Sequence, residues 1–112
     1  MTTTSITSAS FTAQLKEWID YSKPGVTRKA IVKDAQPPIA LMCLTAGTEL
    51  SEHTAPRIVT LMVIDGRGTF TLEGREIVME PGVLIYMPAN TPHALRAEEN
   101  LAFLHLYKSI EP

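Results

Sequence analysis

The sequence predicts an all-β domain, a sandwich or a barrel, with a single helix in front of it. Short apolar and β-branched runs alternate with Gly, Pro and Asp turns from Val26 onward. Helical spacing of apolar residues is confined to residues 10–21. The chain has 112 residues, which is enough for one compact domain with a core and too few for two.

Composition excludes several classes of partner. Ten basic residues against twelve acidic ones give a net charge of −2, whereas nucleic-acid binding requires a basic face. No apolar run approaches the ~18 residues that a membrane span needs, and Cys43, the one cysteine, cannot form an internal disulfide. We therefore expect a cytoplasmic protein with neither a nucleic-acid nor a membrane partner.

The N-terminal part of the chain divides into two segments. Residues 1–9 form a Ser/Thr-rich tail without the features of a signal peptide. The composition favours a disordered tail, whereas the β-branched residues at Thr2–Thr7 suit a strand, and we hypothesise that it pairs with a sheet edge, in this chain or in a partner subunit. Residues 10–25 contain the predicted helix and its closing turn. The helix starts after the N-cap candidate Ser10 and stops at Pro24-Gly25, and its apolar stripe consists of Phe11, Leu15, Trp18 and Ile19.

The barrel domain occupies residues 26–112, and turn residues separate its predicted strands. Pro37-Pro38 breaks the first pair, Asp65-Gly66-Arg67-Gly68 predicts a tight turn, and Pro81-Gly82 marks another. The predicted strands are Val26–Lys33, Ile39–Thr45, Ile58–Ile64, Thr69–Glu73, Glu76–Glu80, Val83–Met87, His93–Ala97 and Leu101–Lys108.

Two stretches of the chain carry a family resemblance. The first has Gly47, His53 and Gly66, and the second has Gly82, Pro88 and His93. In this order and spacing they resemble the two motifs of the cupin superfamily, in particular its small single-domain members. The resemblance, over roughly residues 26–107, implies a cupin jelly-roll barrel (a double-stranded β-helix) that forms homodimers.

The resemblance also implies a metal site, and the chain departs from it. Cupins bind one divalent ion, such as Zn, Fe, Mn or Ni, through two His and a Glu of the first motif and a His of the second. Here Ala55 and Val59 stand at two of those positions, so His53 and His93 remain. Two imidazoles hold a metal weakly. A third ligand would have to come from Glu49, which strand alternation places on the face of His53, or from His105 on the last strand.

The substituted positions favour a small-molecule pocket instead. Apolar side chains at Ala55 and Val59, with Leu61, Tyr86 and Met87, are the candidate wall of a dry cavity. Arg57 is four residues after His53, so on a regular strand it lies on the same face and reaches the pocket mouth, unless Pro56 marks a bulge that interrupts the alternation. Further candidate pocket residues are Tyr86, with its hydroxyl, and His105, which we otherwise expect to be a hydrogen-bonded core histidine.

Two functions follow as hypotheses. In the first, the barrel binds a small organic ligand around His53 and His93, with Arg57, Val59, Tyr86 and His105 as further pocket residues. In the second, the protein is a metal-dependent enzyme with dioxygenase, isomerase or decarboxylase chemistry, and its ion lies on His53, His93 and Glu49. The sequence contains no nucleophile motif and selects no substrate.

Overall fold

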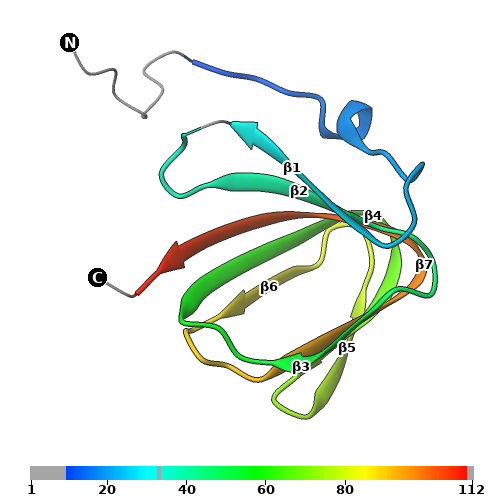
Figure 1. Cartoon of the computed structure of the whole chain (residues 1–112), viewed down its shortest axis with the longest axis vertical. Helices are drawn as coiled ribbons and strands as arrows, with labels where there is room; N and C mark the ends of the chain where they lie inside the picture. The colour runs from blue at the N-terminus through cyan, green and yellow to red at the C-terminus, as the bar shows by residue number, and fades with distance from the viewer. Residues whose placement is uncertain (1–9, 33, 111–112) are drawn as a thin grey trace.

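The computed structural model describes residues 10–32 and 34–110, and they form seven antiparallel strands in one bent sheet (Figure 1). The predicted tail strand at residues 1–9 lies outside the described residues. The elements are the 3-10 turn η1 Leu15–Trp18 and the strands β1 Val26–Val32, β2 Ile39–Leu44, β3 Glu49–His53, β4 Arg57–Leu72, β5 Arg75–Met79, β6 Leu84–Met87 and β7 His93–Ser109.

The two long strands, β4 and β7, organise the sheet by pairing with each other from end to end. The first half of β4 and the second half of β7 lie among β1, β2 and β6, whereas their other halves lie between β3 and β5. Buried side chains from both halves, including Leu61, Val63 and Phe103 from one and Phe70 and Leu95 from the other, form one core. The all-β cupin-type barrel that the sequence predicts is the fold observed.

The predicted tight turn at Asp65-Gly66-Arg67-Gly68 is wrong, because β4 runs through it. The register against β7 shifts between Val63 and Asp65, where Ile64 is an extra residue on β4 and forms a β-bulge that bends the strand. It shifts again between Gly66 and Gly68, where residues 98–100 of β7 stand opposite Arg67. The same holds on β7, where the separately predicted strands are one. Gly and Asp residues are compatible with a β-bulge as well as with a tight turn, so the local sequence does not distinguish the two structures.

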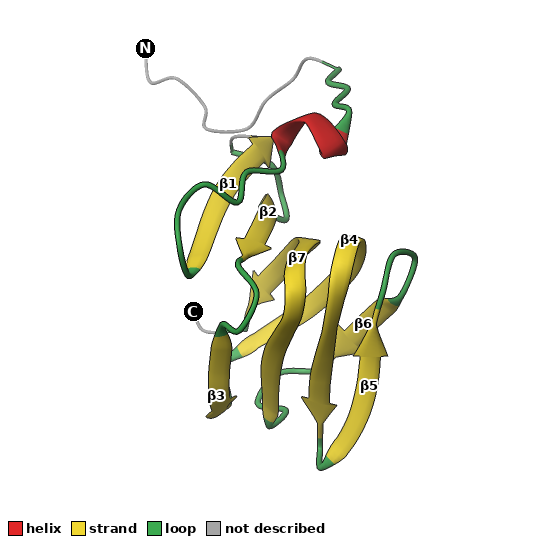
Figure 2. Cartoon of the chain, turned by 90° about the vertical axis from the view of Figure 1, so that its right-hand side faces the viewer, coloured by secondary structure: helices red, strands yellow, loops and turns green. Residues whose placement is uncertain are grey.

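At the first bulge, two consecutive side chains of β4, those of Ile64 and Asp65, lie on the outer face of the sheet. Val63 faces the core, while Ile64 packs in a second cluster on the outside. Asp65, the next residue, accepts a hydrogen bond of 2.7 Å from the Tyr21 hydroxyl. The described segment before β1, residues 10–25, is thereby fixed to the outside of the barrel, beside β1 (Figure 2). This second cluster consists of Ile31, Leu41, Cys43 and Ala102, covered by Leu15, Trp18, Ile19 and other partly buried side chains.

The predicted helix over residues 10–21 is also wrong. The described part of the segment contains one 3-10 turn, Leu15–Trp18, and its N-cap Gln14 makes no capping hydrogen bond. Phe11, on the predicted stripe, is 51% exposed. A helix of about twelve residues is marginal on its own, and Leu15 and Trp18 pack on the outer cluster from an irregular strap, residues 10–25, that contains only this one turn.

The contact between Tyr21 and Asp65 makes a testable contribution to stability. We expect Tyr21→Phe to lower the free energy of unfolding by about 1–2 kcal/mol, because the hydrogen bond has a charged acceptor and is partly buried. Urea denaturation measures this difference. The control is Tyr86→Phe, since Tyr86 is 57% exposed and should change stability by less than about 0.5 kcal/mol. Equal effects of the two changes would contradict the role of the Tyr21 hydroxyl.

None of the helical residues in the described ranges forms a segment long and apolar enough to cross a bilayer. The cytoplasmic location and the homodimer stay predictions, and the molecular mass in solution tests the second of them.

Candidate functional site: a cavity that gathers every histidine

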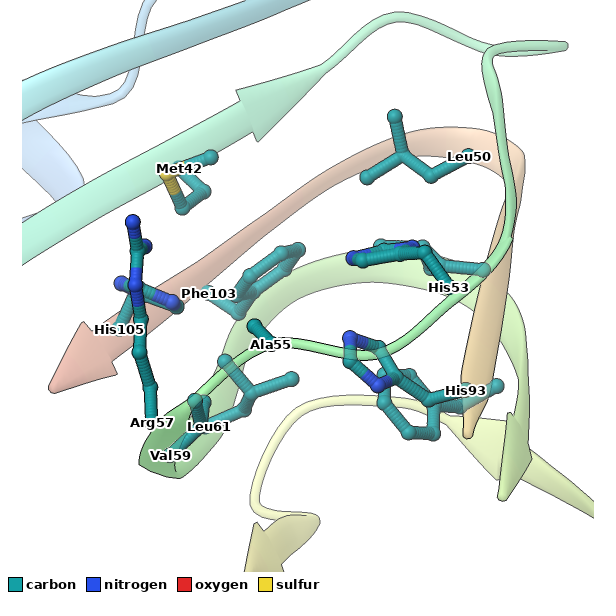
Figure 3. Close-up of a pocket in the computed structure, with 12 residues that line it drawn as sticks. Met42, Leu50, His53, Ala55, Arg57, Val59, Leu61, His93, Phe103 and His105 are labelled. Carbon is teal, nitrogen blue, oxygen red and sulfur yellow. The ribbon is translucent and has the colours of Figure 1, made fainter. Parts of the chain in front are cut away.

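A cavity of about 120 Å³ opens between the two halves of the barrel (Figure 3). For comparison, a dry engineered cavity of about 150 Å³ accepts benzene. All three histidines of the chain contribute to its wall. The complete lining is Met42, Leu50, His53, Ala55, Arg57, Val59, Leu61, Phe70, His93, Leu95, Phe103 and His105.

His53 and His93 meet at one end of the cavity. They are cross-strand partners on β3 and β7, and their ring centroids lie 4.2 Å apart with an interplanar angle of 57°. The Nδ1 of His53 is 2.8 Å from the carbonyl oxygen of Ser51, and the Nδ1 of His93 is 2.8 Å from that of Thr91. A carbonyl oxygen only accepts, so Nδ1 donates in each ring and Nε2 remains for a ligand.

The second imidazole is also fixed by packing. The ring of His93 stacks on that of Phe70, with centroids 5.8 Å apart and an interplanar angle of 8°. Phe70 is 1% exposed, so it provides a rigid support. The two imidazoles are therefore oriented by the protein before any ligand arrives, which lowers the entropic cost of binding.

Arg57 and His105 form the opposite end of the cavity (Figure 3). The guanidinium carbon of Arg57 lies 4.7 Å from the centroid of the Tyr107 ring, a cation–π contact. The His105 ring lies 5.5 Å from the same Tyr107 ring, centroid to centroid. Leu61 is the cross-strand partner of His105. Arg57, Val59 and Leu61 alternate along β4, so all three side chains lie on the cavity side of the strand.

The environment of His105 disfavours its charged form. Burial above all, and then the positive charges of Arg28 and Arg57 and the neighbouring His93, together lower the pKa of His105 to about 4. Its Nδ1 is buried without a hydrogen-bond partner among the described residues. We expected a hydrogen-bonded core histidine; the ring instead lines the cavity as a neutral imidazole with an unused polar atom.

Two sequence candidates lie elsewhere. Glu49 points away from the cavity, and one carboxylate oxygen lies 4.0 Å from the guanidinium of Arg96. The expectation that Glu49 shares the face of His53 is wrong because the β3–β7 register shifts between Leu50 and His53. This bulge resets the alternation, so Leu50 and His53 line the cavity in place of Glu49.

Tyr86 does not line the cavity either. It alternates with Ile85 and Met87, which are buried in the core, and its own side chain is 57% exposed on the outer face of β6. The remaining pocket candidates, Arg57 and Val59, do lie on the wall together with the three histidines.

The donor set does not fit the metal centre that the resemblance implies. Within residues 10–32 and 34–110, no three His, Cys, Asp or Glu side chains gather closely enough to hold an ion. With Glu49 turned outward, no carboxylate of the described residues lines the cavity, and the formal charge on its wall is the cation of Arg57. A divalent cation would have two imidazoles at one end and face a guanidinium at the other, so its usual ligands and its charge compensation are both missing.

The sequence did not indicate several apolar residues of the wall. Met42, Leu50, Phe70, Leu95 and Phe103 come from four strands, and only the sheet register brings them together. The strand at Glu49–His53 is missing from the list of predicted strands, although the placement of Glu49 assumed strand alternation there. It has a single apolar residue, Leu50, among polar ones, and no local signal marks it, since its pairing with β7 is visible only in the fold.

The comparisons agree with this architecture. The family model of the cupin domain matches residues 40–107, more than half of the chain, whereas no curated protein matches the sequence. A conserved protein of unknown function from Streptococcus pyogenes superposes with a TM-score of 0.77 and 22% identity, over 95% of this chain and 93% of its own. A cupin superfamily protein from Desulfitobacterium hafniense gives a TM-score of 0.74 and 19% identity, over 87% and 88% of the two chains.

A larger enzyme contains a similar barrel. A salicylate 1,2-dioxygenase variant from Pseudoaminobacter salicylatoxidans superposes with a TM-score of 0.68 and 20% identity, over 77% of this chain but 27% of its own. Identities this low support the shared fold and not a shared activity. The paired motifs, the bent antiparallel sheet and the match of the family model together show that the chain belongs to the cupin family.

Proposed function

We propose that this protein binds a small organic molecule inside the barrel, between the pair His53–His93 and the pair Arg57–His105. The observation that carries the proposal is a preformed apolar cavity with polar groups only at its two ends. This is the usual composition of a small-molecule site, in which apolar walls supply the affinity and a few polar atoms fix the orientation. The cavity volume of about 120 Å³ suits a ligand close to benzene in size.

The apolar middle of the cavity supplies the burial. Val59, Leu61 and Phe103 are each less than 8% exposed and lie between the two polar ends. The open Nε2 atoms of His53 and His93 provide hydrogen-bonding positions at one end. No specific observation favours the metal-dependent alternative over this one, because its third ligand is turned away.

Binding of three benzene-sized probes, benzoate, benzyl alcohol and benzylamine, tests the proposal. We expect at least one of them to bind with a dissociation constant of about 1 mM or lower. Binding should shift the NMR signals of Leu50, Leu61 and Phe103, and EDTA should not alter it. If none of the three probes shifts these signals, the proposed function is wrong.

A cavity-filling variant locates the binding. Ala55→Phe places a ring at a wall position and should weaken probe binding at least about tenfold. The matched control is Thr54→Phe, because Thr54 is the exposed neighbour that does not line the cavity. Unchanged binding in Ala55→Phe would place the probe elsewhere on the molecule and contradict the proposal.

A further inference from the structure

We infer that the end of the cavity formed by Arg57 and His105 is an anion subsite, and that the ligand is a small organic carboxylate with an apolar body. This inference rests on the proposed function and names the class of ligand. It starts from the charges on the wall: Arg57 contributes a cation, and none of the described Asp or Glu residues lines the cavity.

The arginine is held in place without being neutralised. Tyr107 supports the guanidinium from its ring face, and none of the ion pairs seen in the described residues involves Arg57. An aromatic support leaves the donors at the edge of the guanidinium open, and their fork geometry matches a carboxylate. Arg57 therefore has the orientation of a carboxylate-binding group and lacks a carboxylate partner within the described part of the chain.

One further cation, Arg28, adds to the positive region around His105. The register places Ala40 beside His105 on one side and Leu61 on the other. Arg28, on β1, faces Met42, which lines the cavity. Arginines from β1 and β4 thus approach His105 from its two sides, and both contribute to its electrostatic environment.

His105 leaves the positive charge of this end uncompensated. It lines the cavity together with Arg57, and its lowered pKa keeps the imidazole neutral. A cation at this point would be repelled by Arg57, and a neutral group would leave Arg57 without a counter-charge.

The opposite end of the cavity, at His53 and His93, offers hydrogen-bond acceptors in place of the guanidinium donors of Arg57. Both Nδ1 atoms of His53 and His93 donate to carbonyl oxygens, so in the uncharged tautomer that this allows the lone pair lies on Nε2. A lone pair repels a carboxylate and accepts from a hydroxyl or an amine. The carboxylate of the ligand is therefore directed to Arg57, and its body extends across Phe103 and Val59 toward the histidine pair.

The charge series of benzene-sized probes tests the inference. Benzoate, benzyl alcohol and benzylamine are similar in size and differ in charge. We expect benzoate to bind at least about tenfold more tightly than benzyl alcohol, and benzylamine to bind most weakly. Isothermal titration calorimetry gives the three dissociation constants, and NMR reports whether the ring signals of His105 shift with benzoate.

Arg57→Gln should remove the preference for benzoate, so that benzoate and benzyl alcohol bind this variant with dissociation constants within about twofold of each other. Arg57→Lys should restore only part of it, because an ammonium lacks the planar fork. The control is Arg67→Gln, which removes the same charge from the same strand, where Arg67 pairs with Glu80 outside the cavity. It should leave the benzoate affinity unchanged.

Each other outcome has a definite meaning. If benzyl alcohol binds as tightly as benzoate and both shift the cavity signals, the anion subsite is wrong and the proposed function stands. If Arg57→Gln and Arg67→Gln weaken benzoate equally, the attraction is a property of the net charge, and the subsite is again wrong. If no probe binds, both the inference and the proposed function are overturned.

Discussion

Gly66→Ala is expected to lower the free energy of unfolding by at least about 3 kcal/mol, a large part of the roughly 5–15 kcal/mol that stabilises a typical domain. Two independent costs combine at this position. The backbone has φ of +85°, which an alanine adopts with strain. A Cβ would also collide with the backbone carbonyl of Asn100 on β7, so the two long strands would have to separate where the sheet bends.

Two other glycines divide this effect into its parts. Gly74 has φ of +81°, and no atom lies within 4 Å of the position that a Cβ would take there, so Gly74→Ala measures the backbone strain alone, about 1 kcal/mol. At Gly68 a Cβ would lie 2.7 Å from the carbonyl oxygen of Arg96, and the φ of Gly68 lies outside the left-handed range. Gly68→Ala therefore measures the loss of stability caused by the steric contact with β7 alone. Urea unfolding gives all three values. A loss in Gly66→Ala no larger than in Gly74→Ala would show that the bulge tolerates a wider strand separation.

The second large expected effect is a loss of stability in mild acid that depends on His105. The pKa of His105 falls from its usual 6.5 to about 4 in the folded protein, chiefly through burial. Between these values the unfolded chain binds a proton that the folded chain does not, so unfolding becomes more favourable as the pH falls. Above pH 6.5 His105 is neutral in both states and costs no stability. As the pH falls from 6.5 to about 4, its preference for the unfolded state progressively lowers the free energy of unfolding. At about 1.4 kcal/mol per pKa unit, the loss is of the order of 3 kcal/mol.

Comparison with His105→Leu isolates this contribution. Leucine is apolar and cannot titrate, and the site is flanked by Leu61 and Ala40. Other groups titrate in the same range in both proteins, so the difference between their unfolding free energies is the quantity to follow. We expect this difference to shift in favour of His105→Leu by the order of 3 kcal/mol between about pH 7 and pH 4. Parallel curves for the two proteins would mean that His105 is as easily protonated when folded as when unfolded.

Much of the architecture could be predicted because its signals are local. Apolar runs between turn residues gave the positions of β1, β2, β5 and β6 to within one or two residues. The spacing of Gly47, His53, Gly82 and His93 pointed to the cupin barrel, which the family model supports. Strand alternation alone predicted that Arg57 lies at the pocket. Ala55 and Arg57 both line the cavity, so Pro56 between them does not interrupt this alternation.

The errors occurred where a register shift intervenes or where an element depends on its neighbours. Glu49 was assigned to the face of His53, but the bulge between them turns it outward. The tight turn at Gly66 proved to be a bend within β4, and the helix before the barrel proved to be a strap fixed by Tyr21 and Asp65. Each of these depends on a contact with residues far away in the chain, which local patterns do not encode.

Residue identities and spacing alone predict the class of fold and carry the resemblance to the cupin motifs; that resemblance in turn implies that Ala55 and Val59 stand where metal ligands are expected. The grouping of His105 and Arg57 in one cavity with His53 and His93, without Glu49, became visible only once the strands were paired. The physical reason is that a single inserted residue on one strand inverts the direction of the side chains beyond it. Pairing between distant strands is what fixes where such an insertion lies.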